Sequence, residues 1–384
     1  MRQEMISFLS QHDEALYNLC KYLYENPEES YKEENASKYI CDFLDKYDFE
    51  ITKDFLNIPN SFKAIKGSGH PKICYLCEYD AVKNQGHITG HNALTTISVA
   101  ATIALGKIIN KIGGSVILIG CPGEYLGGTK NIITMQGEFD DMDVVMECHP
   151  DVETCESGTS KAIIPLKIEY NGSSSLTFLN THAYSSLDAL LLNLEIIKSL
   201  SKGFPKDISV NYIISEGGYS PSLIPASCSA KVYIRANNSK TSEFIEHEIR
   251  DISNTISRLT GIKNTTCIYE PPNDELITNS LVNHLFTNNL KENGIINIGP
   301  AKNINAGLSL GIVSKRVPCI HPYISIVNDS NIKYGTLDFA NATISDFAFE
   351  QIKKAALALA STGADIIERK DLLAELTCEY FNNK

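Results

Sequence analysis

The sequence has no tryptophan and few basic residues relative to acidic ones. Of its 384 residues, 34 are Lys or Arg and 46 are Asp or Glu, which gives a formal net charge of -12. A surface that binds phosphate groups needs clustered Lys and Arg, and the sequence contains no basic stripe. The charge balance therefore argues against nucleic-acid partners and against an anionic membrane surface.

Long hydrophobic runs are also missing. Residues 1–13 are polar and lack the apolar core of a signal peptide, and no run is long enough to cross a bilayer. The eleven cysteines are scattered, and the one close pair, Cys74 and Cys77, has no second pair that would complete a zinc site. We therefore expect a cytoplasmic protein with reduced core thiols and no membrane partner.

What the sequence does contain is enough apolar material for two hydrophobic cores, which a chain of this length needs. In the first part of the chain, helical and strand-like patterns alternate. Helical spacing predicts two helices within residues 14–47 and one at 95–109, and continuous apolar runs predict strands at 72–78, 115–120 and 142–146. This order predicts a mostly parallel sheet with helices on both faces, which binds ligands beyond the carboxyl ends of its strands.

The pattern changes after about residue 163, which indicates a second domain. Alternating strands and helices there are typical of an antiparallel α+β domain. Strands are predicted at 164–170, 209–215 and 230–235, and helices at 186–200 and 241–260. A Pro-Pro-Asn-Asp linker follows at 271–274. After it the pattern of the first domain resumes, with helices at 281–292, 345–361 and 371–381 and a strand-like stretch at 317–326. We therefore predict an α/β catalytic-type domain from residues 1–163 and 274–384, with an inserted α+β domain at 164–273.

Polar side chains follow the three predicted strands of the first domain. The segments are 86–92 (Gly-His-Ile-Thr-Gly-His-Asn), 120–125 (Gly-Cys-Pro-Gly-Glu-Tyr) and 147–150 (Glu-Cys-His-Pro). With these segments the chain resembles the family-twenty metallopeptidases of the aminoacylase and carboxypeptidase-G type. The likeness is to their amidohydrolase branch, which splits N-acyl amino acids, aminobenzoyl-glutamate and dipeptides. The motifs stand in the family's order at 78–81, 86–87, 90–92, 112–114, 120–122, 139–141, 149–150, 217–218, 223–225, 313–314 and 320–322.

The resemblance implies five ligands for two metal ions, and only two of them are present. His91 and His149 remain, whereas Thr89 replaces a Cys, Tyr125 replaces a Glu and Gly335 replaces a late His. A Thr hydroxyl stays protonated, and a tyrosine must ionise from a pKa near ~10. Two histidines cannot bridge a pair of ions. We therefore expect no resident cofactor, with zinc or manganese bound weakly at most.

Other residues offer donors that would rebuild a single-metal site. These are Glu147, His87, Tyr334 and Asp338. Because consecutive side chains of a strand face opposite ways, we expect Cys148 to point away from the site and Glu147 to share the side of His149. A rebuilt site requires several such groups to converge on one point.

Three residues are candidates for catalysis. Glu124 keeps the place of the family's general base, and without an ion it is either a remnant of the pocket or an acid/base in other chemistry. Asp80 follows a buried strand and either caps a turn or orients His91. His182 matches the histidine of the inserted domain that, in the family, reaches into the site of the partner chain and steadies an oxyanion, although the segment after it is shorter here.

Four residues are candidates for substrate binding. Thr89 and Tyr125 lie in the pocket segments, and Ser222 stands where the family has a substrate-binding Asn. Arg235 ends a predicted strand and is either a carboxylate anchor or a surface charge.

Three functions remain open. In the first, a metal-free enzyme uses Glu124 and His182 for amide-bond transfer, cyclisation or condensation on an amino-acid-, peptide- or N-acyl-amide-like ligand. In the second, the chain is a noncatalytic binding or regulatory protein. In the third, it is a metal-dependent amidohydrolase with a rebuilt site. The resemblance also implies a ferredoxin-like inserted domain that covers the site as a lid and pairs two chains into a homodimer.

Overall fold

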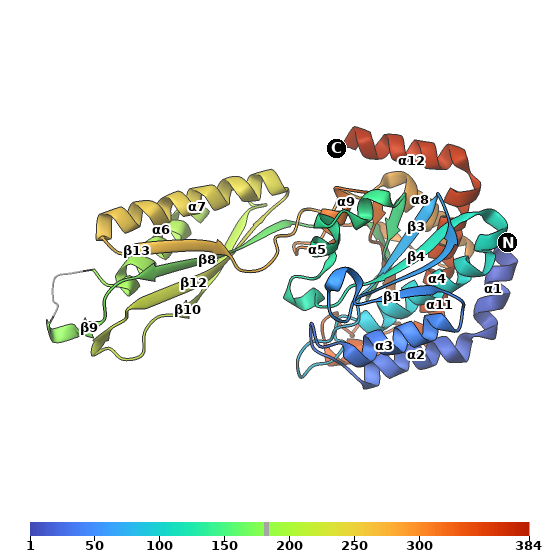
Figure 1. Cartoon of the computed structure of the whole chain (residues 1–384), viewed down its shortest axis with the longest axis horizontal. Helices are drawn as coiled ribbons and strands as arrows, with labels where there is room; N and C mark the ends of the chain where they lie inside the picture. Colours follow the sequence, from blue (N-terminus) through green and yellow to red (C-terminus); the bar gives the residue numbers. More distant parts are fainter. Residues whose placement is uncertain (180–183, 384) are drawn as a thin grey trace. The chain divides into compact units, whose positions relative to one another are not determined.

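The chain divides into two compact units in the computed structural model, which describes residues 1–179 and 184–383 (Figure 1). The larger unit comprises Met1–Thr159, Leu276–Asn303 and Ile312–Lys384, and the smaller comprises Ser160–Glu275 and Ile304–Gly311. The segment at 304–311 groups with the smaller unit, whereas the sequence analysis placed it in the catalytic-type domain.

The larger unit is built on a six-stranded sheet in the order β1-β2-β4-β3-β5-β15. The strands are β1 (Glu50–Lys53), β2 (Phe62–Ser68), β3 (Lys72–Cys77), β4 (Gly114–Gly120), β5 (Val144–Met146) and β15 (Cys319–Ile320). Neighbours from β4 to β15 pair in parallel, and β1 and β2 add an antiparallel edge. The predicted mostly parallel sheet is thus confirmed, although β1 and β2, which form its antiparallel edge, were not among the predicted strands.

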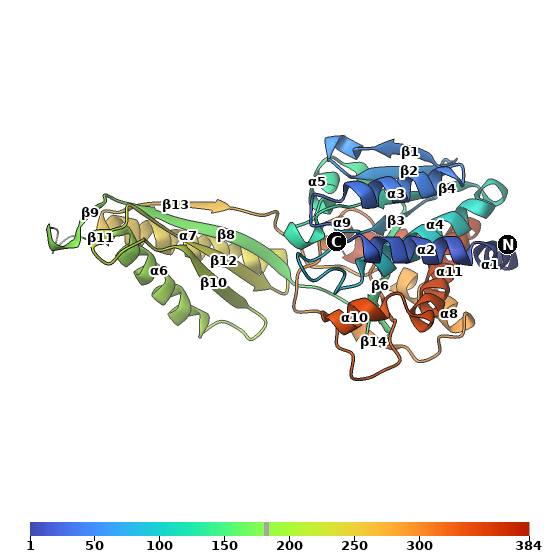
Figure 2. The same ribbon diagram turned by 90° about the horizontal axis from the view of Figure 1, so that it is seen from below.

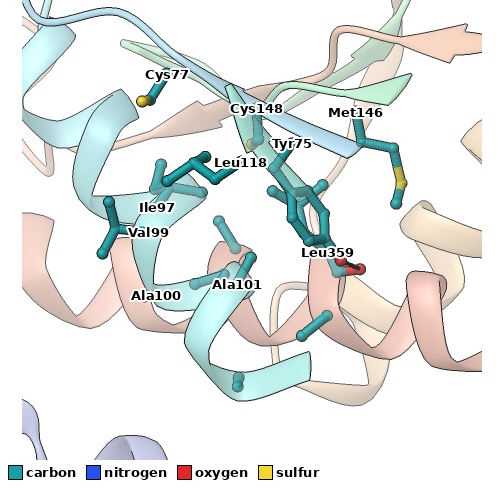
Figure 3. Close-up of a cluster of buried hydrophobic side chains, with 14 of the residues drawn as sticks. Tyr75, Cys77, Ile97, Val99, Ala100, Ala101, Leu118, Met146, Cys148 and Leu359 are labelled. Carbon is teal, nitrogen blue, oxygen red and sulfur yellow. Dashed lines mark hydrogen bonds between the residues drawn. The ribbon is translucent and has the colours of Figure 1, made fainter. Parts of the chain in front are cut away.

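Helix α4 (His91–Ile112) forms the centre of the hydrophobic core. It packs against β3, β4 and α11 (Asp346–Glu368), and its small Ala100 and Ala101 leave room for close approach. Figure 3 shows the ring of Tyr75 pointing from β3 toward α11, where its hydroxyl donates to the Leu359 carbonyl at 2.9 Å. Contrary to the expectation from the sequence, α4 is long and apolar enough to cross a membrane, yet it is buried inside this unit.

The remaining helices of the larger unit come from both ends of the chain (Figure 2). They are α1 (Arg2–Gln11), α2 (Asp13–Glu25), α3 (Glu34–Asp45), α5 (Lys130–Met135), α8 (Ser280–Glu292), α9 (Leu310–Ser314), α10 (Leu337–Ala342) and α12 (Lys370–Asn383). Helices α1 and α2 pack on α4, and α8 and α12 pack on α11. Both ends of the sequence therefore build one core, as an inserted second domain requires.

A second, four-stranded sheet in the larger unit was not predicted. Its order is β14-β7-β16-β6, with β6 (His149–Asp151), β7 (Cys155–Ser157), β14 (Gly299–Lys302) and β16 (Tyr323–Ser325). Strands β6 and β16 pair in parallel, with His149 opposite Tyr323. This pairing fixes the position of His149 beside an aromatic cluster.

The smaller unit has the ferredoxin-like order β-α-β-β-α-β. Its elements are β8 (Ala162–Asn171), α6 (Ser186–Ser201), β10 (Ser209–Glu216), β12 (Ser227–Ala236), α7 (Ser239–Thr260) and β13 (Lys263–Ile268). The sheet order is β10-β12-β8-β13, and every pairing is antiparallel. A short pair, β9 (Ser175–Leu176) with β11 (Leu223–Ile224), lies outside it. Alternate residues of β8 and β12 pack on α6 and α7, as the period-two pattern predicts.

Candidate functional site

A cluster of charged side chains lies beyond the carboxyl ends of three neighbouring strands. Glu78 and Asp80 follow β3, Glu124 follows β4 in the 3-10 helix η2 (Glu124–Leu126), and Glu147 follows β5. His91 is the first residue of α4. Because parallel strands end at the same edge of a sheet, residues far apart in sequence meet there. The sequence analysis expected ligands at this edge.

His91 is held between two carboxylates. Its Nδ1 donates to Asp80 Oδ1 at 2.8 Å, and its Nε2 lies 3.1 Å from Glu78 Oε2. Burial opposes protonation, but the hydrogen bond to Asp80 and the charge of Glu78 raise the pKa of His91 to about 9. His91 is therefore an imidazolium at neutral pH.

Asp80 orients its neighbours as well as His91. Its second oxygen, Oδ2, accepts hydrogen bonds from Ser30 Oγ at 2.7 Å and from the Tyr125 backbone N–H at 3.0 Å. The side chain is fully buried. Asp80 thus ties β3, α4 and the η2 loop together, and its contact with His91 is compatible with the orienting role considered above.

Lys130, the first residue of α5, carries a positive charge into the middle of the cluster. Its side chain is completely buried, and its Nζ contacts Glu78 Oε1 and lies 3.3 Å from Glu124 Oε1 and 3.5 Å from Glu147 Oε1. Burial opposes its charge, yet the three carboxylates raise the pKa of Lys130 well above its ordinary value. This residue was not predicted, because a single Lys in the segment Gly127-Gly128-Thr129-Lys130 has no distinguishing pattern.

The pKa values of the neighbouring Glu78 and Glu147 carboxyl groups are shifted in opposite directions. Burial opposes ionisation of Glu78, but the charges of Lys130 and His91 prevail and hold its pKa well below the usual range. Burial raises the pKa of Glu147 well above its usual range, and Lys130 does not compensate, because Glu78 and Glu124 add repulsion. Glu147 therefore holds a proton where Glu78 is ionised, a division of roles typical of functional sites.

The side chains of Thr89 and Tyr125 form a hydrogen bond with each other. The Tyr125 ring stacks on His91 with ring centroids 4.7 Å apart. Burial raises the pKa of Tyr125 above its ordinary value, so it remains a neutral phenol. Both hydroxyls share a part-buried environment, which places them at the more accessible side of the cluster.

One group of three possible metal donors is present among the described residues. Donor atoms of Glu78, His91 and His149 all lie within 4.8 Å of one another. His149 Nδ1 donates to the Pro150 carbonyl at 2.8 Å, and burial lowers the pKa of His149 to about 4, so it is a neutral imidazole. By proximity, these three residues could take one ion. Glu78 was not among the predicted ligands.

A second ion finds no donors at the positions that the resemblance implies. The hydroxyls of Thr89 and Tyr125 are bonded to each other, and Gly335 has no side chain. Binding of one ion at Glu78, His91 and His149 is also opposed, because both oxygens of Glu78 already contact other side chains, Lys130 and His91. The residues present do not fit a two-ion centre.

The four residues considered for rebuilding a metal site lie in different surroundings. Glu147 belongs to the cluster, whereas His87 is turned away and donates from Nε2 to the Leu23 carbonyl at 3.0 Å. Asp338 is exposed on α10. The ring of Tyr334 lies 6.1 Å from that of His149, centroid to centroid.

Two predicted ligand-binding residues belong to the smaller unit. Arg235 of β12 donates from Nη1 to Asn211 Oδ1 at 2.8 Å, and its guanidinium lies 5.2 Å from the centre of the Tyr233 ring. Ser222 is exposed next to Leu223, which helps to line a hollow of about 640 Å³. His182 lies outside the described residues.

Comparison with known proteins gives matches over both units. Residues 180–259 match the M20 peptidase dimerisation domain. The chain is 28% identical to the mouse Xaa-Arg dipeptidase over 392 residues, which cover 96% of this chain and 89% of that protein. It is 30% identical to one of the chains of the p-aminobenzoyl-glutamate hydrolase of Escherichia coli K12 over 260 residues, which cover 61% and 54%. The chain is similar to peptidases and amide hydrolases over most of its length.

Solved structures of such hydrolases share the fold of this chain. A putative aminohydrolase from methicillin-resistant Staphylococcus aureus gives a TM-score of 0.78 at 18% identity and covers 96% of this chain and 100% of that one. A dinuclear metal-binding peptidase of the M20 family from Bacillus subtilis gives 0.67 at 15% identity, with 92% and 99% covered. The M20 dimerisation match spans α6, β10, β11, β12 and nearly all of α7.

Proposed function

We propose that the cluster around Glu124 binds an amino-acid-, peptide- or N-acyl-amide-like ligand and acts on its amide bond without a pair of metal ions. The carrying observation is the position of Glu124. Its carboxylate pairs with Lys130, and its side chain is 9% exposed, whereas the side chain of Glu147 is fully buried. Relatives named as a dipeptidase and an aminobenzoyl-glutamate hydrolase support an amide as the ligand.

In this proposal Glu124 is the acid/base and its neighbours position it. Lys130 orients the carboxylate, and the hydroxyls of Thr89 and Tyr125 are donors and acceptors for polar groups of the ligand. Asp80 acts through His91 and the Tyr125 backbone rather than on the ligand. Proton transfer by Glu124 suits amide-bond transfer, cyclisation or condensation, and His182 is proposed as its counterpart from a partner chain.

A second candidate, a single-ion amidohydrolase, rests on the three-donor group of Glu78, His91 and His149. Zinc or manganese held there would supply Lewis-acid polarisation of an amide carbonyl. For that, Lys130 would have to release Glu78, and His91 would have to lose its proton. These two requirements make it the weaker candidate.

We further propose that two chains pair through the smaller unit. The dimerisation-domain match covers β10, which is an edge strand of its sheet. Ile213 on this strand is 63% exposed, and an unpaired edge with exposed apolar side chains is a template for strand addition. A homodimer buries this edge.

The test is turnover and binding by the chelator-treated full chain on a panel of dipeptides, N-acyl amino acids and aminobenzoyl-glutamate, followed by mass spectrometry and calorimetry. Glu124→Gln should lower turnover by about 10²-fold or more, the usual contribution of acid–base catalysis, and leave ligand affinity within a few-fold. Glu138→Gln, which alters an ion pair with Lys63, is the matched control and should change neither.

Other outcomes decide against the proposal. Unchanged turnover in Glu124→Gln would remove Glu124 from the reaction. Binding without turnover by the wild-type chain on the whole panel would favour a noncatalytic binding protein. Activity that chelation abolishes and zinc restores would favour the single-ion hydrolase.

A further inference from the structure

Four acidic side chains converge at the site around Lys130 and His91. They are Glu78, Asp80, Glu124 and Glu147. Gathering carboxylates in a buried space is unfavourable unless a cation compensates them. In a metal centre that cation is the ion, whereas here an ammonium attached to the chain contacts three of the four.

The place of Lys130 in its helix shows that the carboxylates determine it. Lys130 is the first residue of α5, and a positive charge is disfavoured at a helix N-terminus. Its side chain is also completely buried. Lysine is almost never completely buried unless an acidic partner compensates its charge. Both costs are offset by the ion pairs with Glu78 and Glu124 and by the contact with Glu147.

We propose that Lys130 takes the place of a metal ion as the resident cation of this site, and that its ammonium keeps divalent ions off the group of Glu78, His91 and His149. Glu78 is the decisive contact. Its Oε1 contacts Lys130 Nζ and its Oε2 lies 3.1 Å from His91 Nε2, so an ion can reach either oxygen only by displacing one of these two side chains. An ion bound there would also lie beside the like charge of Lys130.

A resident ammonium accounts for the replaced ligands. Anionic Cys or Glu side chains at positions 89 and 125 would add charge that only a divalent ion could balance. The neutral hydroxyls of Thr89 and Tyr125 bond to each other instead. The inference goes beyond the proposed function, because it holds whether or not the chain turns over an amide.

The experiment compares metal binding by the full chain and two lysine variants. Wild type, Lys130→Met and the control Lys63→Met, which loses an ion pair with Glu138, are stripped with chelator, loaded with zinc or manganese and gel-filtered. Metal per chain is then measured by elemental analysis and zinc affinity by calorimetry. Wild type and Lys63→Met should retain far less than one ion per chain. Lys130→Met should retain about one and bind zinc at least about tenfold tighter, because the empty carboxylate group then accepts an ion.

Two results would overturn the inference. One is a wild-type chain that keeps about one ion per chain after dialysis. The other is a folded Lys130→Met chain that binds zinc no more tightly than wild type. If Lys130→Met does not fold, Lys130→Met with Glu124→Gln removes one ammonium and one of its paired carboxylates together and is judged by the same two results. Turnover is not a readout here, so failure of the proposed amide chemistry is detected separately.

Discussion

Lys130 Nζ and Glu78 Oε1 form an ion pair beyond the carboxyl end of β3, with side chains that are 1% and 9% exposed. The pair joins the first residue of α5 to the strand end that also positions His91. Breaking it leaves a buried carboxylate without its partner, and such a loss is costly because water cannot replace the ammonium.

Lys130→Met should therefore lower the free energy of unfolding by about 3–5 kcal/mol, the range for removing one partner of a buried pair. Lys63→Met removes a more exposed pair with Glu138, whose side chains are 22% and 18% exposed, and should cost about 1 kcal/mol or less. Urea unfolding of both variants without added metal measures the difference. Equal losses would show that the Lys130 cluster contributes no more than an ordinary surface pair.

Gly128→Ala should displace Glu124. The φ of Gly128 is +71°, and an added Cβ would lie 2.6 Å from Glu124 Oε1. Gly137→Ala is the matched control, since its φ is +81° but its Cβ would lie 3.5 Å from the nearest atom, Asp140 Oδ2. Both variants should lose about 1–2 kcal/mol of stability from the left-handed backbone. Only Gly128→Ala should also lose turnover on the substrate that the amide panel identifies, and retained turnover would contradict the role of Glu124.

Stability should depend on pH through Glu33, which lies beneath the Glu124 loop and accepts from the Gly123 N–H at 2.7 Å. Burial, with a contribution from Asp80, raises the pKa of Glu33 from 4.5 to about 7. The folded state therefore holds this proton more tightly than the unfolded state, and the resulting stability is complete below pH 4.5 and lost as pH rises through 7.

Glu33→Gln keeps the acceptor and removes the titration. The unfolding free energy of the variant minus that of the wild type should increase by about 3 kcal/mol from about pH 4.5 to pH 8, because only the wild type loses this contribution. Urea unfolding of both chains across this range gives the difference, in which the other titrating groups cancel. Parallel pH profiles for the two chains would show that Glu33 does not titrate as described.

Ile213→Glu should prevent chain pairing, because it places a charge on the exposed edge of β10. Leu259→Glu alters a residue that is 73% exposed near the end of α7 and should leave the mass unchanged. Light scattering after gel filtration should give a dimeric mass for the wild type and the control and a monomeric mass for Ile213→Glu. A dimeric Ile213→Glu chain would place the interface elsewhere.

Much of the fold was predictable because long elements with a regular hydrophobic period carry a strong signal. The predicted strand at 115–120 is β4 (Gly114–Gly120), and the predicted helix at 186–200 is α6 (Ser186–Ser201). Strands β6, β7 and β14 were missed, since such short segments show no period, whereas β16 lies within the strand-like stretch predicted at 317–326.

The site was predictable only where motifs carried it. Strand alternation predicted that Glu147 and Cys148 face opposite ways, and Glu147 lies in the charged cluster while Cys148 packs in the core (Figure 3). The contacts of Lys130 with three carboxylates were not predictable. They depend on three strand ends meeting one helix start, which is a property of the tertiary fold.

The central claim is that an ammonium rather than a metal ion is the resident cation of this site. The most direct test is a crystal structure of the zinc-soaked full chain, with anomalous diffraction recorded at the zinc edge. We predict no anomalous peak between Glu78, His91 and His149, and Lys130 Nζ in contact with Glu78. A peak about 2.0–2.2 Å from donor atoms of these three residues, with Lys130 displaced, would contradict the claim.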